Sequence, residues 1–233
     1  MMLRKSLSTL FLLLFLCHLN AQELPDTISC DSVNGETKDV MHKYVEGVVI
    51  GVDVVSPITY VTSGYGSIEG MLKANISNRY FPCFEAGFAS SDYTDDETDI
   101  SYKTTAPYFR VGLDYNILRD KTQRTHILYA GFRYGFTTFK YDYSGETLDP
   151  ITQVSSPFSA EGLSSTCHWG ELLMGAQVSV LKNFHMAWTV RYKMKFKFGG
   201  NAEGDPYYVP GFGTTTSNST WGITYNLIWD LRW

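Results

Sequence analysis

Residues 221–233 read WGITYNLIWDLRW and end the sequence on an aromatic residue. Every second position is large and apolar, namely Trp221, Ile223, Tyr225, Leu227, Trp229, Leu231 and Trp233. Most positions between them are small or polar. Successive side chains of a β-strand point to opposite faces, so a period of two over this length predicts one long strand with an apolar face and a polar face.

The same alternation recurs upstream and predicts seven more strands. Their alternating positions fall in residues 48–54, 68–76, 80–88, 109–117, 128–136, 172–180 and 186–198. The connections at 77–79, 118–124 and 181–183 are short, and those at 57–66, 90–105, 141–165 and 199–216 are long. Short turns at one end and long loops at the other are typical of membrane barrels. We therefore expect residues 46–233 to form an all-β, eight-stranded antiparallel up-and-down transmembrane β-barrel.

The face opposite the apolar one carries the charges that decide which side points inward. We expect a charge network in the lumen formed by Glu69, Lys73, Glu85, Arg110, Asp114, Arg133, Glu171, Arg191, Lys193, Lys195, Lys197, Asp230 and Arg232. Opposite charges around a narrow lumen can pair, whereas isolated charges in a dry core cost a great deal. The apolar face suits lipid and would be a large exposed patch on a soluble protein. The pattern therefore favours a membrane barrel over a soluble, lipocalin-like barrel, whose apolar face is inward.

The N-terminus is typical of a secretory signal peptide, which we expect to span residues 1–21. Arg4 and Lys5 precede a short apolar stretch, and Ala21 marks the expected cleavage point. The apolar stretch is shorter than the ~20 residues that a membrane-spanning helix needs. Residues 22–45 are polar and show no periodicity, which predicts a flexible periplasmic leader.

The cysteines indicate neither a disulfide framework nor a zinc site. Lipidation at Cys17 is the less favoured alternative to cleavage, because Leu16 stands where a small residue is expected. Cleavage would leave Cys30, Cys83 and Cys167, an odd number whose redox state the sequence leaves open. Free thiols in a packed lumen are favoured over a Cys30–Cys83 bond. No cysteine or histidine spacing suggests a metal, and we expect no cofactor.

The charge balance excludes one class of partner. The chain has 24 acidic and 19 basic residues, with a net charge of −5 and no basic cluster outside one predicted strand. This balance argues against nucleic-acid binding. The aromatic share of 15% fits the aromatic girdles of a membrane protein.

Three short features carry a family resemblance: Asn20-Ala21-Gln22, Arg79-Tyr80-Phe81-Pro82, and the ending from Trp229 to Trp233. With them the chain resembles the small eight-stranded outer-membrane barrels of Bacteroidetes, many of which form families of unknown function. Its architecture is also similar to the OmpA and OmpX type, whose interiors are filled by side chains. The resemblance implies a cell outer-membrane location and contact with outer-membrane lipids. It also implies that barrel-assembly machinery reads the terminal strand through Tyr225, Leu227, Trp229, Leu231 and Trp233.

The basic row Arg191, Lys193, Lys195 and Lys197 allows three interpretations. It could guide anions through a small pore, bind lipid phosphates near the rim, or pair with lumen acids and plug the barrel. An eight-stranded barrel is only just wide enough for its side chains to fill, so a plugged lumen is favoured. We therefore expect a structural or surface-interaction role, with an unknown surface ligand recognised by the long loops.

Two further features bear on activity. The loop from Asp92 to Asp99 is acidic but lacks calcium-loop spacing, which favours a solvated external loop. His168 beside Ser164 and Ser165 is the best candidate pair for a lipid-modifying enzyme. No nucleophile motif surrounds that pair, so we expect no enzymatic activity and keep lipid modification as an alternative.

Overall fold

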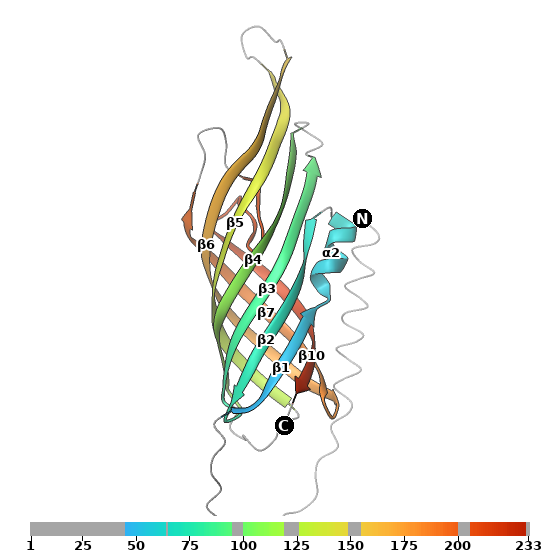
Figure 1. The fold of residues 1–233 in the computed structure, drawn as a ribbon, viewed down its shortest axis with the longest axis vertical. Coiled ribbons are helices and arrows are strands. Elements are labelled where there is room, and N and C mark those ends of the chain that lie inside the picture. The colour runs from blue at the N-terminus through green and yellow to red at the C-terminus, as the bar shows by residue number, and fades with distance from the viewer. Residues whose placement is uncertain are drawn as a thin grey trace, which may run out of the picture. The chain divides into compact units, whose positions relative to one another are not determined.

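A computed structural model describes residues 45–63, 65–94, 100–118, 126–148, 155–199 and 206–231 (Figure 1). The expected signal peptide, nearly all of the expected leader, Cys30, Arg232 and Trp233 lie outside these described residues. We call the end of the barrel with the long β5–β6 hairpin its upper end. The end with the turn at residues 77–79 is its lower end.

Eight strands of the described residues close into one barrel in the order β1, β10, β7, β6, β5, β4, β3, β2. The strands are β1 (Val45–Asp53), β2 (Tyr65–Ile76), β3 (Tyr80–Thr94), β4 (Ser101–Asn116), β5 (His126–Leu148), β6 (Ser155–Leu181), β7 (Phe184–Phe198) and β10 (Ser219–Leu231). Every neighbouring pair is antiparallel, including β1 with β10. The predicted all-β, eight-stranded up-and-down barrel is confirmed.

Two of the expected long loops are mostly strand. β3 and β4 pair as far as Thr94 and Ser101, and β5 and β6 pair as far as Leu148 and Ser155. The expected loops at 90–105 and 141–165 are therefore wrong over most of their length. Both faces of these upper strand segments carry polar side chains, so no apolar alternation marks them in the sequence.

The other two expected loops contain regular structure. A helix, α2 (Val55–Ser63), begins two residues before the expected loop 57–66 and covers most of it. A small hairpin of β8 (Tyr208–Val209) and β9 (Gly213–Thr214) lies in the expected loop 199–216. No helix in the described part of the chain is both long and apolar enough to cross a membrane.

Asp53 ends β1 and starts α2. Its carboxylate accepts hydrogen bonds from the backbone N–H groups of Val55 (3.2 Å) and Ser56 (3.1 Å), which is the arrangement of a helix N-cap. The same carboxylate accepts the N–H of Tyr225 in β10 at 3.1 Å. One side chain therefore stops the strand, caps the helix and joins both to the last strand.

The two faces of the wall differ sharply in exposure. The outer face carries exposed apolar side chains, such as Ile68 (72% exposed) and Trp221 (71% exposed). The inner face carries charged side chains that are almost fully buried, such as Glu85 at 0% and Arg191 at 2% exposure. The apolar rows therefore face away from the barrel axis and the ionic rows face the interior.

Glycines opposite the inner charges make room for them. Gly131 of β5 pairs across the sheet with Asp114 of β4. A Cβ atom at Gly131 would lie 2.2 Å from an Asp114 carboxylate oxygen and 2.6 Å from the Leu113 carbonyl oxygen. No side chain fits at that distance without moving the backbone.

This crowding predicts that Gly131→Ala destabilises the barrel by about 1–3 kcal/mol, the usual cost of overpacking. The matched control is Gly70→Ala on the exposed outer face, where the nearest atom is 4.0 Å from the added Cβ. The measurement is the thermal unfolding temperature of each variant in detergent. Equal unfolding temperatures for the two variants would show that the interior is not tightly filled.

Candidate functional site

Strand register places acids and bases side by side on the inner face of the wall. Glu85 of β3 stands opposite Arg110 of β4, and Arg133 of β5 stands opposite Glu171 of β6. Arg191 of β7 reaches the same group from the other side of the lumen, since it bonds to both Glu85 and Glu171. Opposite signs on neighbouring strands bring the charged heads into contact.

Glu85 is the centre of the cluster. Its two oxygens accept hydrogen bonds from Arg191 Nη1 (2.7 Å) and Nη2 (3.1 Å), Arg110 Nη1 (2.9 Å) and Arg133 Nε (3.0 Å). Three guanidinium groups from three strands therefore share one fully buried carboxylate. Such charge-assisted bonds are stronger than neutral ones and fix the positions of the side chains.

Three further carboxylates complete the cluster. Asp114 accepts two bonds from Arg133 (2.6 and 2.9 Å) and lies 2.7 Å from Lys73 Nζ. Glu69 accepts bonds from Arg110 (2.7 Å) and the Tyr108 hydroxyl (2.6 Å). Glu171 accepts bonds from Arg191 (3.0 Å) and the Trp169 indole N–H (2.7 Å).

The buried cluster is electrically balanced. Its cations are Lys73, Arg110, Arg133 and Arg191, and its anions are Glu69, Glu85, Asp114 and Glu171. All eight are buried. We call this set the ionic network. Equal numbers of opposite charges in contact offset the cost of removing each charge from water.

The remaining members of the expected lumen network lie elsewhere. Lys193 and Lys195 are half-buried, and their ammonium groups donate to backbone carbonyls of Gly211 (2.8 Å) and Thr215 (3.2 Å). Lys197 is exposed near the upper end of β7 and takes part in none of the ion pairs above. Asp230 lies at the lower end, 3.7 Å from His185, apart from the ionic network. Arg232 is outside the described residues.

The β8–β9 hairpin packs inside the upper barrel, which the sequence analysis did not anticipate. Its Val209 and Phe212 are fully or almost fully buried, and Phe212 meets the Trp169 ring edge-on at 6.2 Å. The carbonyl of Gly211 accepts bonds from both Arg110 (3.2 Å) and Lys193 (2.8 Å). The apolar run from Tyr207 to Phe212 was the available signal, because an exposed loop rarely needs so many apolar residues.

Two details hold this hairpin in place. The Tyr102 hydroxyl donates to the Tyr208 carbonyl at 2.7 Å. Gly211 has φ of +80°, and a Cβ there would lie 2.5 Å from the Tyr108 ring. Only glycine suits both this backbone conformation and this close approach.

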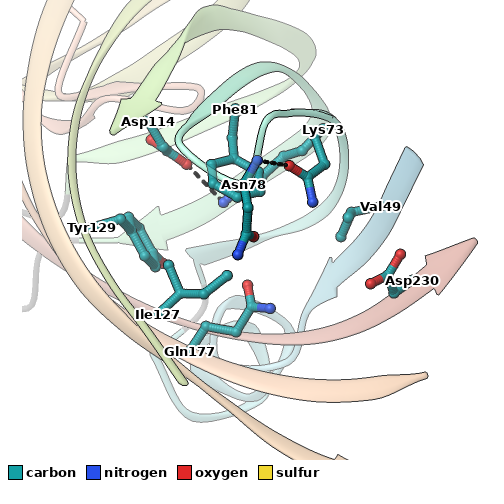
Figure 2. A pocket seen from close by; sticks show the side chains of 10 residues that line it. Val49, Lys73, Asn78, Phe81, Asp114, Ile127, Tyr129, Gln177 and Asp230 are labelled. Atoms are coloured by element: carbon teal, nitrogen blue, oxygen red, sulfur yellow. Dashed lines mark hydrogen bonds and ion pairs between the residues drawn. The ribbon is translucent and has the colours of Figure 1, made fainter. Parts of the chain in front are cut away.

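The lower half of the barrel contains one small cavity of about 20 Å³ (Figure 2). Lys73 and Asp114 line one part of it, and Asn78, Gln177 and Asp230 line other parts. A cavity of this size holds about one water molecule. It is far too small to pass a hydrated ion.

The outer face changes from apolar to polar along the upper part of β3 and β4. Phe88 stands opposite Pro107, and the next outward pair, Ser90 and Thr105, is joined by a hydrogen bond of 2.8 Å. The pair beyond it, Asp92 and Lys103, forms an exposed ion pair of 2.9 Å. This change marks an upper limit to the apolar band.

The candidate enzymatic pair does not assemble. His168 lies on the outer face, where its Nδ1 is 2.8 Å from the Tyr134 hydroxyl. Ser165 is buried on the opposite face and donates to the Gly199 carbonyl at 2.6 Å. Ser164 shares the outer face but is four residues away, about 13 Å along a strand.

The described residues contain no group of three or more acidic, cysteine or histidine side chains that could hold a metal ion. Of the acidic loop, Asp92 pairs with Lys103, and positions 95–99 lie outside the described residues. Cys83 and Cys167 are buried free thiols.

A family model described as "Domain of unknown function (DUF6048)" matches residues 2–231. None of the curated proteins matches the chain. Among solved structures, it is similar to a major outer membrane protein from Thermus thermophilus, with 13% identity, a TM-score of 0.47 and coverage of 82% of this chain and 100% of that one.

Two other solved structures are similar to the chain. For Neisserial surface protein A the identity is 14%, the coverage is 81% of this chain and 96% of that one, and the TM-score is 0.40. For Ail, the attachment invasion locus protein of Yersinia pestis, the identity is 12%, the coverage is 80% of this chain and 97% of that one, and the TM-score is 0.37. Likeness at these levels transfers no function to the chain.

The ionic network predicts that Glu85→Gln lowers the free energy of unfolding by about 3–5 kcal/mol, because it leaves buried guanidinium groups without their shared anion. Asp92→Asn is the matched control, since it breaks an exposed ion pair that contributes about 0–1 kcal/mol. Urea unfolding in detergent, followed by tryptophan fluorescence, measures both. The interpretation fails if the two variants unfold at the same urea concentration.

Proposed function

We propose that this chain, which belongs to the family described as "Domain of unknown function (DUF6048)", is an integral outer-membrane β-barrel with an ionically closed lumen and a surface-interaction role. The observation that carries the proposal is the contrast between an exposed apolar outer face and a buried, balanced interior. In this proposal the protein has a structural role and binds a partner at the cell surface, without catalysis.

The outer face supports a membrane location. Exposed large apolar side chains occur on all eight strands, with Ile50, Ile68, Phe84, Val111, Phe132, Leu172, Val190 and Trp229 as one example each. A continuous patch of this size is unfavourable in water and favourable in lipid. From Tyr80 to Phe88 the band measures about 26 Å along β3, or roughly 20 Å after a tilt of about 40°, which is close to the ~25 Å expected of such barrels.

The lipid-facing barrel and the expected signal peptide together support the outer membrane as the compartment. Barrels that face lipid with their outer side occur in bacterial outer membranes, and the expected signal peptide at 1–21 would deliver the chain to the periplasm. The lower end, with its short turns, would then face the periplasm. The partners we propose are outer-membrane lipids and the assembly machinery. The proposed assembly signal is the outward row Tyr225, Leu227, Trp229 and Leu231 of β10, together with Trp233, which lies outside the described residues.

A closed lumen is supported by three layers of the interior. The ionic network crosses the middle of the barrel, because side chains from β2 to β7 meet at Glu85 and its neighbours. The β8–β9 hairpin fills the space above it, and the cavity described below it is water-sized. We therefore favour a plugged barrel over a pore.

The surface role is supported by the β5–β6 hairpin, which Figure 1 shows reaching beyond the other strands. The β6 residues from 155 to 160 pair with β5, whereas Ser165 and Thr166 already bond to Gly199, which follows β7. Among the described strands, β6 from 155 to 160 thus pairs along one edge only. Such edges can accept an added strand from a partner.

The proposal predicts that the refolded protein shows heat-modifiable migration on SDS gels and no conductance steps in planar bilayers. The first result follows from a closed membrane barrel, and the second from its filled interior. A porin of known conductance, inserted under the same conditions, is the control for insertion. Regular conductance steps from the wild-type chain would contradict the closed lumen, and recovery in the aqueous fraction without detergent would contradict the membrane location.

A further inference from the structure

The barrel wall is incomplete beside its shortest strand. β1 pairs with β10 only from Val48 to Asp53, and with β2 no farther than Val52 opposite Gly70. Above that level, the β10 residues 219–224 pair only with β7, and the β2 residues 65–69 pair only with β3, among the described strands. Two strand edges therefore face each other without a strand between them.

The helix α2 stands where β1 would continue. It follows β1 directly and packs mainly against β2, with fewer contacts to β10 (Figure 1). Because a helix satisfies its own backbone groups, it cannot complete the sheet as a strand would. Between the upper parts of β2 and β10, α2 thus takes the place of a strand, and no hydrogen-bonded ladder joins the two edges among the described residues.

A cavity of about 290 Å³ occupies this place. Outward-facing Trp221 and Ile223 line it together with inward-facing Gly222 and Thr224. Residues from both faces of one strand border the same cavity where that cavity reaches the edge of the strand. The cavity therefore lies along the unpaired edge of β10, where the outer, lipid-side face of the wall meets the barrel interior.

The inner part of this cavity is cationic. Arg110, Arg191, Lys193 and Glu69 line it. The two arginines are neutralised within the ionic network, whereas Lys193 forms none of the ion pairs found in the described part of the chain. Its ammonium group donates to the carbonyls of Gly211 (2.8 Å) and Phe212 (3.2 Å), which leaves one of its three N–H groups for a ligand.

A second unsatisfied group lies beside this cation. Glu69 is buried, and its Oε1 atom has no hydrogen-bond donor among the described residues, although Arg191 Nη2 is 3.8 Å away. A buried carboxylate oxygen without a donor is costly. A ligand with an anionic oxygen for Lys193 and a nearby hydroxyl for Glu69 would satisfy both groups.

We propose that this opening is a lateral binding site for an anionic amphiphile that enters from the membrane, with a phosphate headgroup on Lys193 and its apolar chain along Trp221 and Ile223. The proposal rests on the membrane-spanning barrel proposed above. It adds a ligand class and an entry route that a sealed, purely structural barrel does not require.

The test is a titration of the refolded barrel in an uncharged maltoside detergent with three probes: lysophosphatidic acid, the monoacylglycerol of the same chain, and glycerol 3-phosphate. We expect binding of lysophosphatidic acid, measured by calorimetry, and at least about tenfold weaker binding of the other two, because each lacks one half of the recognised chemistry. Equal binding of glycerol 3-phosphate would overturn the membrane route. Equal binding of the monoacylglycerol would overturn the cation site.

Variants locate the site. Lys193→Met should weaken binding of lysophosphatidic acid about tenfold or more, through loss of a charge-assisted bond. Lys197→Met is the matched control on the same strand, and it should bind as the wild type does, because Lys197 does not line this cavity. Wild-type affinity in Lys193→Met would overturn the proposal.

A second pair of variants leaves Lys193 in place. Thr220 of β10 stands opposite Lys193 and lines the cavity, so Thr220→Glu should supply an internal carboxylate and abolish binding. Thr220→Gln, of the same size without the charge, should retain it, and equal loss in both would overturn the electrostatic assignment. Heat-modifiable migration verifies the barrel in every preparation, so absent binding by a folded barrel counts against the site and leaves the proposed function standing.

Discussion

Mutual neutralisation of eight charges inside the barrel is the condition on which the rest of the structure depends. Glu85 accepts bonds from three guanidinium groups, and each of these also contacts another carboxylate, so the eight side chains form one connected set. Charges transferred from water to such an interior are tolerated only when they are paired and hydrogen-bonded. The arrangement also determines the outer surface, because a strand that places its polar residues inward has only apolar ones left for the outside.

Size matching lets this network fit within a narrow cylinder. The inner positions opposite several long side chains are glycines: Gly135 stands opposite Arg110, Gly112 opposite Arg133, and Gly222 opposite Arg191. A small barrel has just enough interior for side chains to fill it. A glycine on one strand therefore leaves the space that the long charged side chain of the neighbouring strand occupies.

The strands of the lower and middle barrel could be predicted because each of them alternates between a large apolar residue and a polar or small one. The same alternation also places charged residues such as Glu85 and Arg110 on the inner face. The upper parts of β5 and β6 could not be predicted, because Ser, Thr and Gly on both faces leave no contrast. The helix α2 was missed because its cap, Asp53, also fits the polar face of the alternating pattern at residues 48–54 that predicted a strand.

Contacts between distant segments were beyond sequence reasoning. Lys193 and Lys195 were expected to meet carboxylates, yet they meet backbone carbonyls of the β8–β9 segment, because that segment folds inward. Nothing in the spacing of residues 199–216 says whether the loop extends outward or packs inside. The apolar residues of this segment indicate that it is buried, but they do not predict which part of the barrel it packs against.

The shortness of β1 also bears on how the cylinder forms and comes apart. β1 and β10 are the first and last strands along the chain, so their pairing is the step that turns an open sheet into a ring, and it requires the whole strand set to be in place. In that joint β1 is paired only from Val48 to Asp53, whereas β5 is paired with β6 from His126 to Leu148. Local opening is easiest where few backbone bonds must break, so the joints of the short β1 open more readily than the long β5–β6 joint.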